Sequence, residues 1–139
     1  MDFVRFLHSW TRWGVVIVAV IAVVWMLLGL VQKRAYSKND GLLMTAFSSL
    51  IGLQWLIGVV LIIIYGSQVS FNVRYIWEHL TVMTIALAVA HAHYAYKRRA
   101  LPDSTRYRNN LLVIVATFVL IFIGIALLPS GIQWRFVGL

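Results

Sequence analysis

The chain has four histidines, His8, His79, His91 and His93, and they are its main candidates for chemistry. It has no cysteine, which excludes disulfides, iron–sulfur clusters, thiolate zinc sites and covalently attached c-type haem. Any metal must therefore be held by histidine, methionine or oxygen ligands. Neutral imidazoles from two helices can ligate a haem iron on its two faces, and these axial ligands tune its potential. Histidines facing each other across a bundle would thus predict a b-type haem.

Long uncharged segments contain or flank these histidines. The 139 residues are 62% hydrophobic and 12% charged, with a mean hydropathy of +0.88. Soluble proteins are about 45–50% apolar and about 25% charged. A helix needs about 20 apolar residues to cross about 30 Å of hydrocarbon. The sequence predicts an all-α integral membrane protein with a single transmembrane domain over residues 1–139, an up-down four-helix bundle with spans at about 7–31, 42–65, 75–97 and 110–129.

Basic residues are distributed unevenly between the two sides of this bundle. Cytoplasmic connections carry an excess of Lys and Arg, and aromatic residues gather at the interfaces. The connections 32–41 and 98–109 are therefore predicted to be cytoplasmic and both termini to lie on the outer side. The same topology explains the net charge of +8, so no nucleic-acid partner is expected. The inner side has Lys33, Arg34, Lys38, Lys97, Arg98, Arg99, Arg106 and Arg108, and the outer side has Arg5, Arg12, Arg74 and Arg135.

His8 and His79 are the predicted metal ligands. The first and third helices of an up-down bundle run in the same direction, so both histidines lie about one turn inside the outer interface. A haem held between them would lie near the outer face. Arg12 follows His8 by four residues on the same helix face, where it could bind a haem propionate, a lipid phosphate or Glu78. Arg74 is a further candidate for a propionate, although its i,i+4 spacing from Glu78 favours an ion pair at the interface.

Each of these residues also has a purely structural interpretation. A histidine one turn inside the membrane can hydrogen-bond a lipid headgroup or a neighbouring carboxylate. Ionisable groups within spans nevertheless tend to face the interior of a bundle, a cavity or a cofactor. The matched depths of His8 and His79 favour the cofactor over the structural interpretation when the two are taken as a pair.

The spacing of the histidines gives weaker support to a second site near the inner face. His93 follows His79 by 14 residues, which returns to within about 40° of the same helix face at about 100° per residue. The spans have no second histidine that could pair with His91 or His93 from another helix. Met26 is expected at the same depth and would offer a His–Met haem. The simpler alternative is that His91 and His93 contact anionic lipid beside the basic residues that follow them.

Five short segments, spread over nearly the whole chain, match a known pattern: 7–13, 74–79, 90–91, 108–112 and 127–129. They resemble a group of small four-helix bacterial membrane proteins, largely uncharacterised, some of which are labelled cytochrome b-like. The resemblance implies a haem or quinone connection through the matching positions His8, Arg12, Glu78, His79 and His91. Some similar proteins carry a further histidine on the second helix, where this chain has Gly52 and Gln54. This departure weakens the case for a second haem.

Three classes of function follow. The first is a membrane-embedded electron-transfer protein of the bacterial inner membrane, which holds a b-type haem near the outer face and exchanges electrons with quinone or a partner redox protein. The second is a non-catalytic accessory subunit of a larger respiratory or photosynthetic membrane complex. A transporter ranks last, because Glu78 lies at the interface and not near the midplane, where transporter sites are built. The chain has neither a phosphate-binding glycine loop nor a His-Glu-x-x-His zinc motif, so no enzymatic reaction is assigned.

Overall fold

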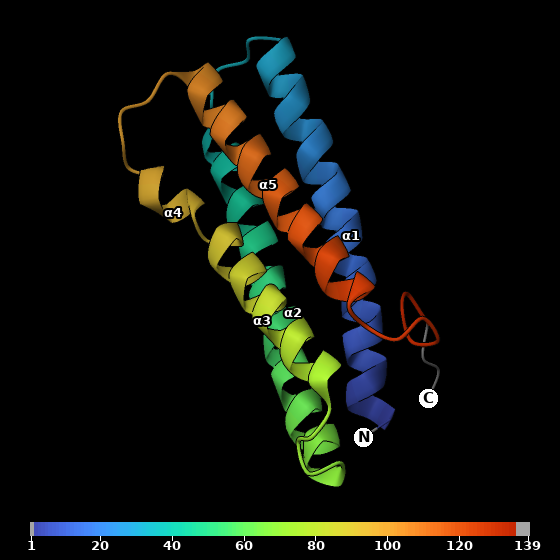
Figure 1. Ribbon diagram of the computed structural model, residues 1–139. Coiled ribbons are helices and arrows are strands. Elements are labelled where there is room, and N and C mark those ends of the chain that lie inside the picture. Colours follow the sequence, from blue (N-terminus) through green and yellow to red (C-terminus); the bar gives the residue numbers. More distant parts are fainter. Residues whose placement is uncertain (1, 136–139) are drawn as a thin grey trace.

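The computed structural model describes residues 2–135, and in this part of the chain the regular secondary structure is helical, without strands. Four long helices form a bundle, and a single-turn helix follows the third of them (Figure 1). The elements in chain order are α1 (Asp2–Val31), α2 (Lys38–Gln68), α3 (Arg74–Ala90), α4 (His93–Tyr96) and α5 (Asp103–Ala126). The predicted helical bundle is therefore confirmed.

The long helices are arranged as a ring in which sequence neighbours run antiparallel. Helix α1 packs against α2 and α5, and α3 packs against the same two helices from the opposite corner (Figure 1). Helices α1 and α3 consequently run in the same direction. The ends of the described chain lie together, because Ser9 Oγ and Arg12 Nη2 each donate a hydrogen bond of 2.8 Å to the carbonyl of Arg135.

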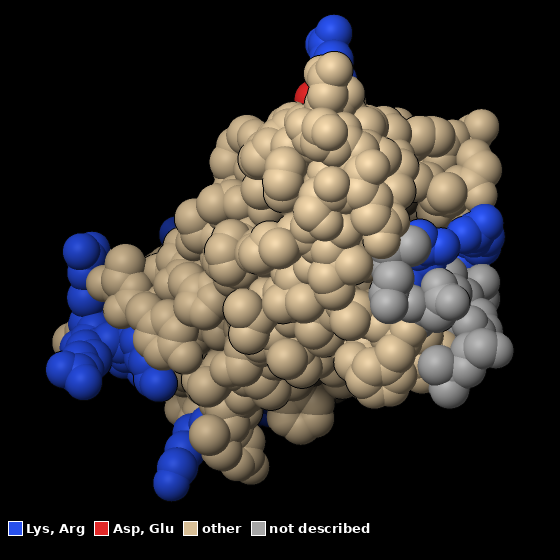
Figure 2. All heavy atoms as spheres, turned by 90° about the horizontal axis from the view of Figure 1, so that it is seen from below, with Lys and Arg blue, Asp and Glu red and all other residues tan. Residues whose placement is uncertain are grey.

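Three of the helices are long and apolar enough to cross a membrane: Phe3–Val31, Lys38–Gln68 and Asp103–Ala126. Large apolar side chains remain exposed along them, among them Ile17, Val24, Ile63 and Val119. In the view from below in Figure 2, Lys and Arg lie at the margin of a broad uncharged surface. Extended apolar exposure of this kind marks contact with a membrane or another protein. Length and surface together indicate a membrane protein.

The third predicted span, 75–97, differs from the structure near its end. Helix α3 stops at Ala90, and a turn at His91 and Ala92 separates it from α4. The main-chain N–H groups of Ala92, Tyr94 and Ala95 bond to carbonyls three residues back, as in a 3₁₀ turn. The α-helical rotation of about 100° per residue therefore does not extend from His79 to His93, and the predicted common face does not apply to this pair.

A buried carboxylate closes the end of the bundle opposite the termini. Asp40 is 1% exposed and accepts hydrogen bonds from Trp25 Nε1 at 2.6 Å, Tyr107 Oη at 2.9 Å and the main-chain N–H of Ser37 at 2.7 Å. Arg34 Nη2 lies 3.9 Å from the same carboxylate. Because these donors come from α1, α5 and the α1–α2 connection, Asp40 ties three parts of the chain together.

A glycine in α1 allows this closure. The fully buried ring of Tyr107 occupies the position that a Cβ atom at Gly29 would take. We expect Gly29→Ala to lower the free energy of unfolding by about 1–3 kcal/mol, as overpacking of a core does. Thermal unfolding in detergent measures the effect, and Gly41→Ala is the matched control because no atom lies within 4 Å of its Cβ position. Equal stabilities of the two variants would contradict this packing.

Candidate functional site

A cavity of about 300 Å³ lies inside the half of the bundle nearer the termini. All four long helices and the segment after α5 line it, and its walls are mostly apolar. Small-molecule sites in proteins are typically concave, apolar and about 300–1,000 Å³, with a few polar groups that orient the ligand. The polar groups that line this cavity include Arg5, His8, Arg12, Gln54, His79 and Arg135.

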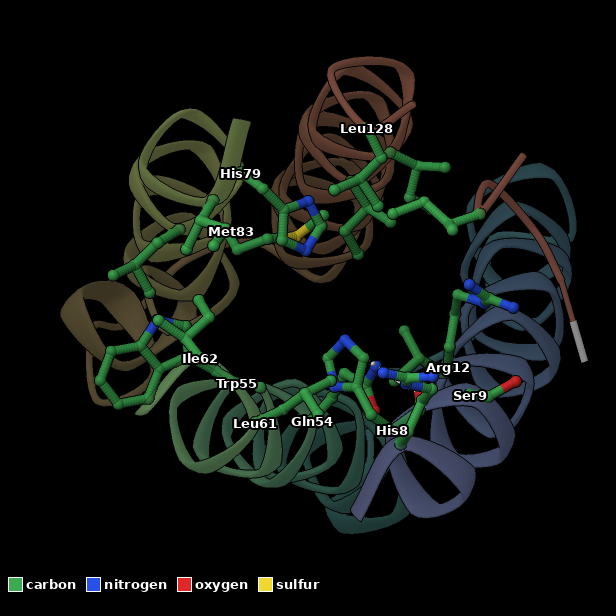
Figure 3. A pocket seen from close by; sticks show the side chains of 18 of the residues that line it. His8, Ser9, Arg12, Gln54, Trp55, Leu61, Ile62, His79, Met83 and Leu128 are labelled. Carbon is green, nitrogen blue, oxygen red and sulfur yellow. Dashed lines mark hydrogen bonds between the residues drawn. The ribbon is translucent and has the colours of Figure 1, made fainter. Parts of the chain in front are cut away.

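His8 and His79 line this cavity from opposite corners of the ring. Figure 3 shows the His8 ring projecting from α1 and the His79 ring from α3, each toward the centre of the cavity and toward the other. This arrangement follows from the parallel direction of α1 and α3 and from the similar depth of the two residues. The structure thus brings together the two histidines that the sequence singles out as a pair.

His79 is held in a defined tautomer. Its Nδ1 lies 2.8 Å from the carbonyl oxygen of Gly124 in α5, and because a carbonyl can only accept, Nδ1 carries the proton. The amide of Leu128, four residues after Gly124, bonds to Ile125 instead, so this carbonyl belongs to the unpaired last turn of α5. In a neutral imidazole, Nε2 then keeps its lone pair. Metal-binding histidines are commonly oriented by such a bond to a main-chain carbonyl.

His8 has a ring nitrogen without a partner. Its Nδ1 is buried and makes no hydrogen bond, and its Nε2 lies 3.5 Å from Gln54 Nε2, at the limit of hydrogen bonding. Gln54 is already engaged with the main chain of α1, because its amide donates to the carbonyl of His8 at 2.9 Å. Thr11 donates a second hydrogen bond to Gln54 Oε1. A buried polar atom with no partner is uncommon, and here it is an imidazole nitrogen of a residue that lines the cavity.

The cavity is positively charged. Arg5, Arg12 and Arg135 line it, and neither an Asp nor a Glu does among the residues whose side chains the structure describes. Arg12 lies 5.6 Å from the centre of the Trp134 ring, and its buried Nε makes no hydrogen bond. A ligand with an apolar body and an acidic edge would match this lining, because charge-assisted hydrogen bonds to an anion are the strongest that Arg makes.

The remaining predicted site residues lie elsewhere. Arg74 Nε and Glu78 Oε1 form the expected ion pair at 2.5 Å, and neither residue lines the cavity. Near the other end of the bundle, His91 Nδ1 bonds to the carbonyl of Leu87 at 2.9 Å, and the buried His93 bonds through Nε2 to Ser48 Oγ at 3.0 Å. The structure does not gather these four residues into one site.

Met26, the predicted partner of the inner histidines, also makes its contacts away from them. It is fully buried, and its sulfur accepts a hydrogen bond from Asn110 at 3.8 Å. Met26 does not line the second cavity of the bundle, which His93 does line. Among the described residues, Met26 and His93 therefore share no cavity that could hold a His–Met haem.

Sequence reasoning assigned no role in the site to Gln54, Arg5 or Arg135. Gln54 is a polar residue in the middle of an otherwise apolar segment, and that alone marks it as a residue in need of a buried partner. Arg135 follows α5 by nine residues, and it reaches the cavity because the chain turns back toward α1. Its position depends on tertiary contacts and has no local sequence pattern.

Two histidines are too few ligands for a bare tetrahedral metal ion. Among residues 2–135, no three His, Asp or Glu side chains come together as a metal site. A haem needs only two axial ligands, because the porphyrin supplies the others. The site therefore fits a haem better than a bare ion. The two histidines, including the unpartnered nitrogen of His8, suit the iron, and the arginines suit the two carboxylates beside the apolar macrocycle.

Comparison with models of known protein families finds no match, and neither the curated proteins nor the solved structures contain one. The resemblance to small four-helix membrane proteins therefore stays a prediction from the sequence. The function has to be argued from the cavity and its side chains.

Proposed function

We propose that this protein is an electron-transfer protein of the bacterial inner membrane that binds one b-type haem between His8 and His79. The observation that carries the proposal is the pair of imidazoles facing each other across a mostly apolar cavity, with Nδ1 of His79 bonded to Gly124. Haem would supply one-electron exchange in this site. The redox partner is a membrane quinone or another redox protein, and both termini lie on the outer side.

The residues around the two imidazoles have separate tasks. Gly124 holds the ring of His79 and keeps its Nε2 lone pair directed away from α5. Gln54 and Thr11 fix the first turns of α1, and with them the depth of His8. Arg12 and Arg135 place positive charge on one side of the cavity, where the propionates would be neutralised. The apolar walls exclude water, which strengthens these interactions.

A titration with haem tests this proposal. The protein, purified in detergent without haem, should bind one equivalent with a saturating Soret band and the spectrum of a six-coordinate, low-spin iron. Absence of saturable binding by a folded protein would contradict the proposal. Binding with an unchanged spectrum in the presence of excess imidazole supports two protein ligands, since an open axial position would accept the imidazole.

A substitution on α2 probes the position of His8. A Cβ atom at Gly58 would lie 3.0 Å from His8 Cε1, so Gly58→Ala requires the imidazole to shift by a few tenths of an ångström. Moving a side chain off its rotamer costs about 0.5–1.5 kcal/mol, and we expect haem affinity to fall roughly twofold to tenfold. Gly52→Ala is the control on the same helix, because its closest contacts are 3.9–4.0 Å. Equal haem affinity of both variants would contradict a role for this tight contact in holding His8 as a ligand.

A further inference from the structure

A second cavity, of about 390 Å³, lies at the other end of the bundle, away from the proposed haem. It is lined by the α1–α2 connection, the first turns of α2, helix α4 with the residue after it, and the first two turns of α5. Eight of the twelve Lys and Arg residues of the chain belong to this end, in the segments 33–38 and 97–108. The cavity thus lies within the most basic part of the protein.

Three cations from separate elements converge on this cavity: Lys38 in α2, Lys97 after α4 and Arg106 in α5. Within the described part of the chain, neither an Asp nor a Glu lines it. The nearby carboxylate of Asp40 is occupied by Trp25, Tyr107 and Ser37, so it does not neutralise these cations through a direct contact. The charge of the cavity therefore favours an anion.

Two hydrogen-bond donors in the cavity have no acceptor among the described residues. The Nε of Arg106 is buried and unpartnered, while its Nη2 donates to the carbonyl of Arg99 at 2.9 Å. The hydroxyl of Tyr36 accepts a hydrogen bond of 2.8 Å from Asn110 and keeps its own proton to donate. Burial raises the pKa of Tyr36, against the lowering effect of the Asn110 hydrogen bond, so that proton is retained at neutral pH. Both donors would be satisfied by the oxygens of an anion.

The surface beside the cavity is apolar. Leu42 lines the cavity and is 54% exposed, and it lies in α2, one of the helices long and apolar enough to cross a membrane. An occupant with an anionic head in the cavity could therefore lay a hydrocarbon chain along α2. Basic pockets between transmembrane helices on the cytoplasmic side are suited to anionic lipid headgroups.

We infer that this cavity binds the phosphate of an anionic phospholipid, with Arg106, Lys97 and Lys38 as its cationic contacts and Tyr36 as a hydrogen-bond donor. Arg106 makes directed hydrogen bonds to the phosphate oxygens, and the two lysines contribute as point charges. The N-terminus of α2 adds a favourable dipole at the same place. The site is independent of haem, since the two cavities share no lining residue.

Thermal unfolding of the delipidated protein in a neutral detergent tests this inference. Phosphatidylglycerol should raise the unfolding temperature in a saturable manner, and phosphatidylcholine should not. Because each cation near a lipid surface contributes about 1 kcal/mol, Arg106→Gln and Lys97→Gln should each weaken the affinity for phosphatidylglycerol by about fivefold. Arg108→Gln, an exposed residue two positions from Arg106 and outside the cavity, is the control and should change the affinity by less than about twofold.

Two other outcomes would each overturn a part of the inference. A loss in Arg108→Gln as large as in the cavity variants would mean diffuse attraction by the basic end and overturn the site. Stabilisation by inorganic phosphate alone, at millimolar concentration, would overturn a lipid as the occupant. If Arg106→Gln does not fold, the comparison of Lys97→Gln with Arg108→Gln decides the question, because both residues are exposed.

Discussion

Replacement of His79 by alanine is expected to remove the low-spin haem spectrum and to weaken haem binding by more than about hundredfold. Loss of residues that merely support a ligand costs 10–100-fold in metal affinity, so loss of the ligand itself should exceed that range. His8→Ala should have the same effect, because each histidine supplies one axial position. Absorbance titration with haem in detergent measures both variants. His91→Ala is the control, since His91 does not line the cavity.

His79 also has a structural task, which needs a separate variant. Its Nδ1–H satisfies the carbonyl of Gly124, and loss of such a bond destabilises a protein by about 1 kcal/mol. His79→Gln keeps an N–H donor on a flexible side chain but removes the imidazole. We expect this variant to unfold near the temperature of the wild type and still to lack the low-spin spectrum. A low-spin spectrum retained in both substitutions of His79 would exclude it as a ligand.

Asp40→Ala is expected to lower the free energy of unfolding by about 3–5 kcal/mol, the usual cost of removing one partner from a buried charged network. Trp25 Nε1 and the main-chain N–H of Ser37 would lose their acceptor, and Tyr107 would keep only its longer bond of 3.3 Å to the carbonyl of Ala35. Unfolding by a denaturing detergent, followed by tryptophan fluorescence, measures the change. Asp103→Ala is the matched control, because Asp103 is exposed at the start of α5.

The Asp40→Ala variant also tests whether the two ends of the molecule act independently. Asp40 lies at the opposite end from the proposed haem, so a folded Asp40→Ala protein should keep the affinity of the wild type for haem within about twofold, as distant sites usually act independently. A change in stability no larger than that of Asp103→Ala would show that the buried network contributes little. The contacts of Asp40 would then be incidental to the fold.

Local patterns of the sequence predict much of the fold. The distribution of charges along the chain predicts three of the four long helices close to their observed positions, because burying a charge in an apolar environment is costly. Helices α1 and α2 extend further than predicted, with α2 beginning at Lys38 and not at 42. Helix α5 begins at Asp103 and not at 110, and it ends at Ala126 and not at 129. Ser37 and Asp40 have the spacing of a capping box, and this pattern could have placed that boundary.

The end of α3 has no such pattern. Neither Gly nor Pro occurs at 91–92, so nothing in the sequence predicts an interruption. In the structure, His91, the first residue after α3, bonds through Nδ1 to the carbonyl of Leu87 in the last turn of that helix, and the following residues form a tighter turn. The buried His93 then reaches Ser48 on α2. Both events depend on contacts between helices, which a single sequence does not reveal.

The candidate site was only partly predictable. Matching depth placed His8 and His79 together, because depth in a membrane follows from position along a helix. The arginines at the mouth of the cavity include Arg135, which is separated by more than 120 residues from its contact Ser9. The bond between Tyr107 and Asp40 joins residues 67 positions apart. Pairings of this range depend on how the four helices assemble.

The most direct test of a haem held by two histidines is a reduced-minus-oxidised absorption spectrum of the protein purified from bacterial membranes, with His8→Ala and His79→Ala beside it. The account predicts the sharp α and Soret bands of a bis-histidine b-type haem in the wild type and their loss in both variants. A colourless wild-type protein that is folded and binds no added haem would contradict it.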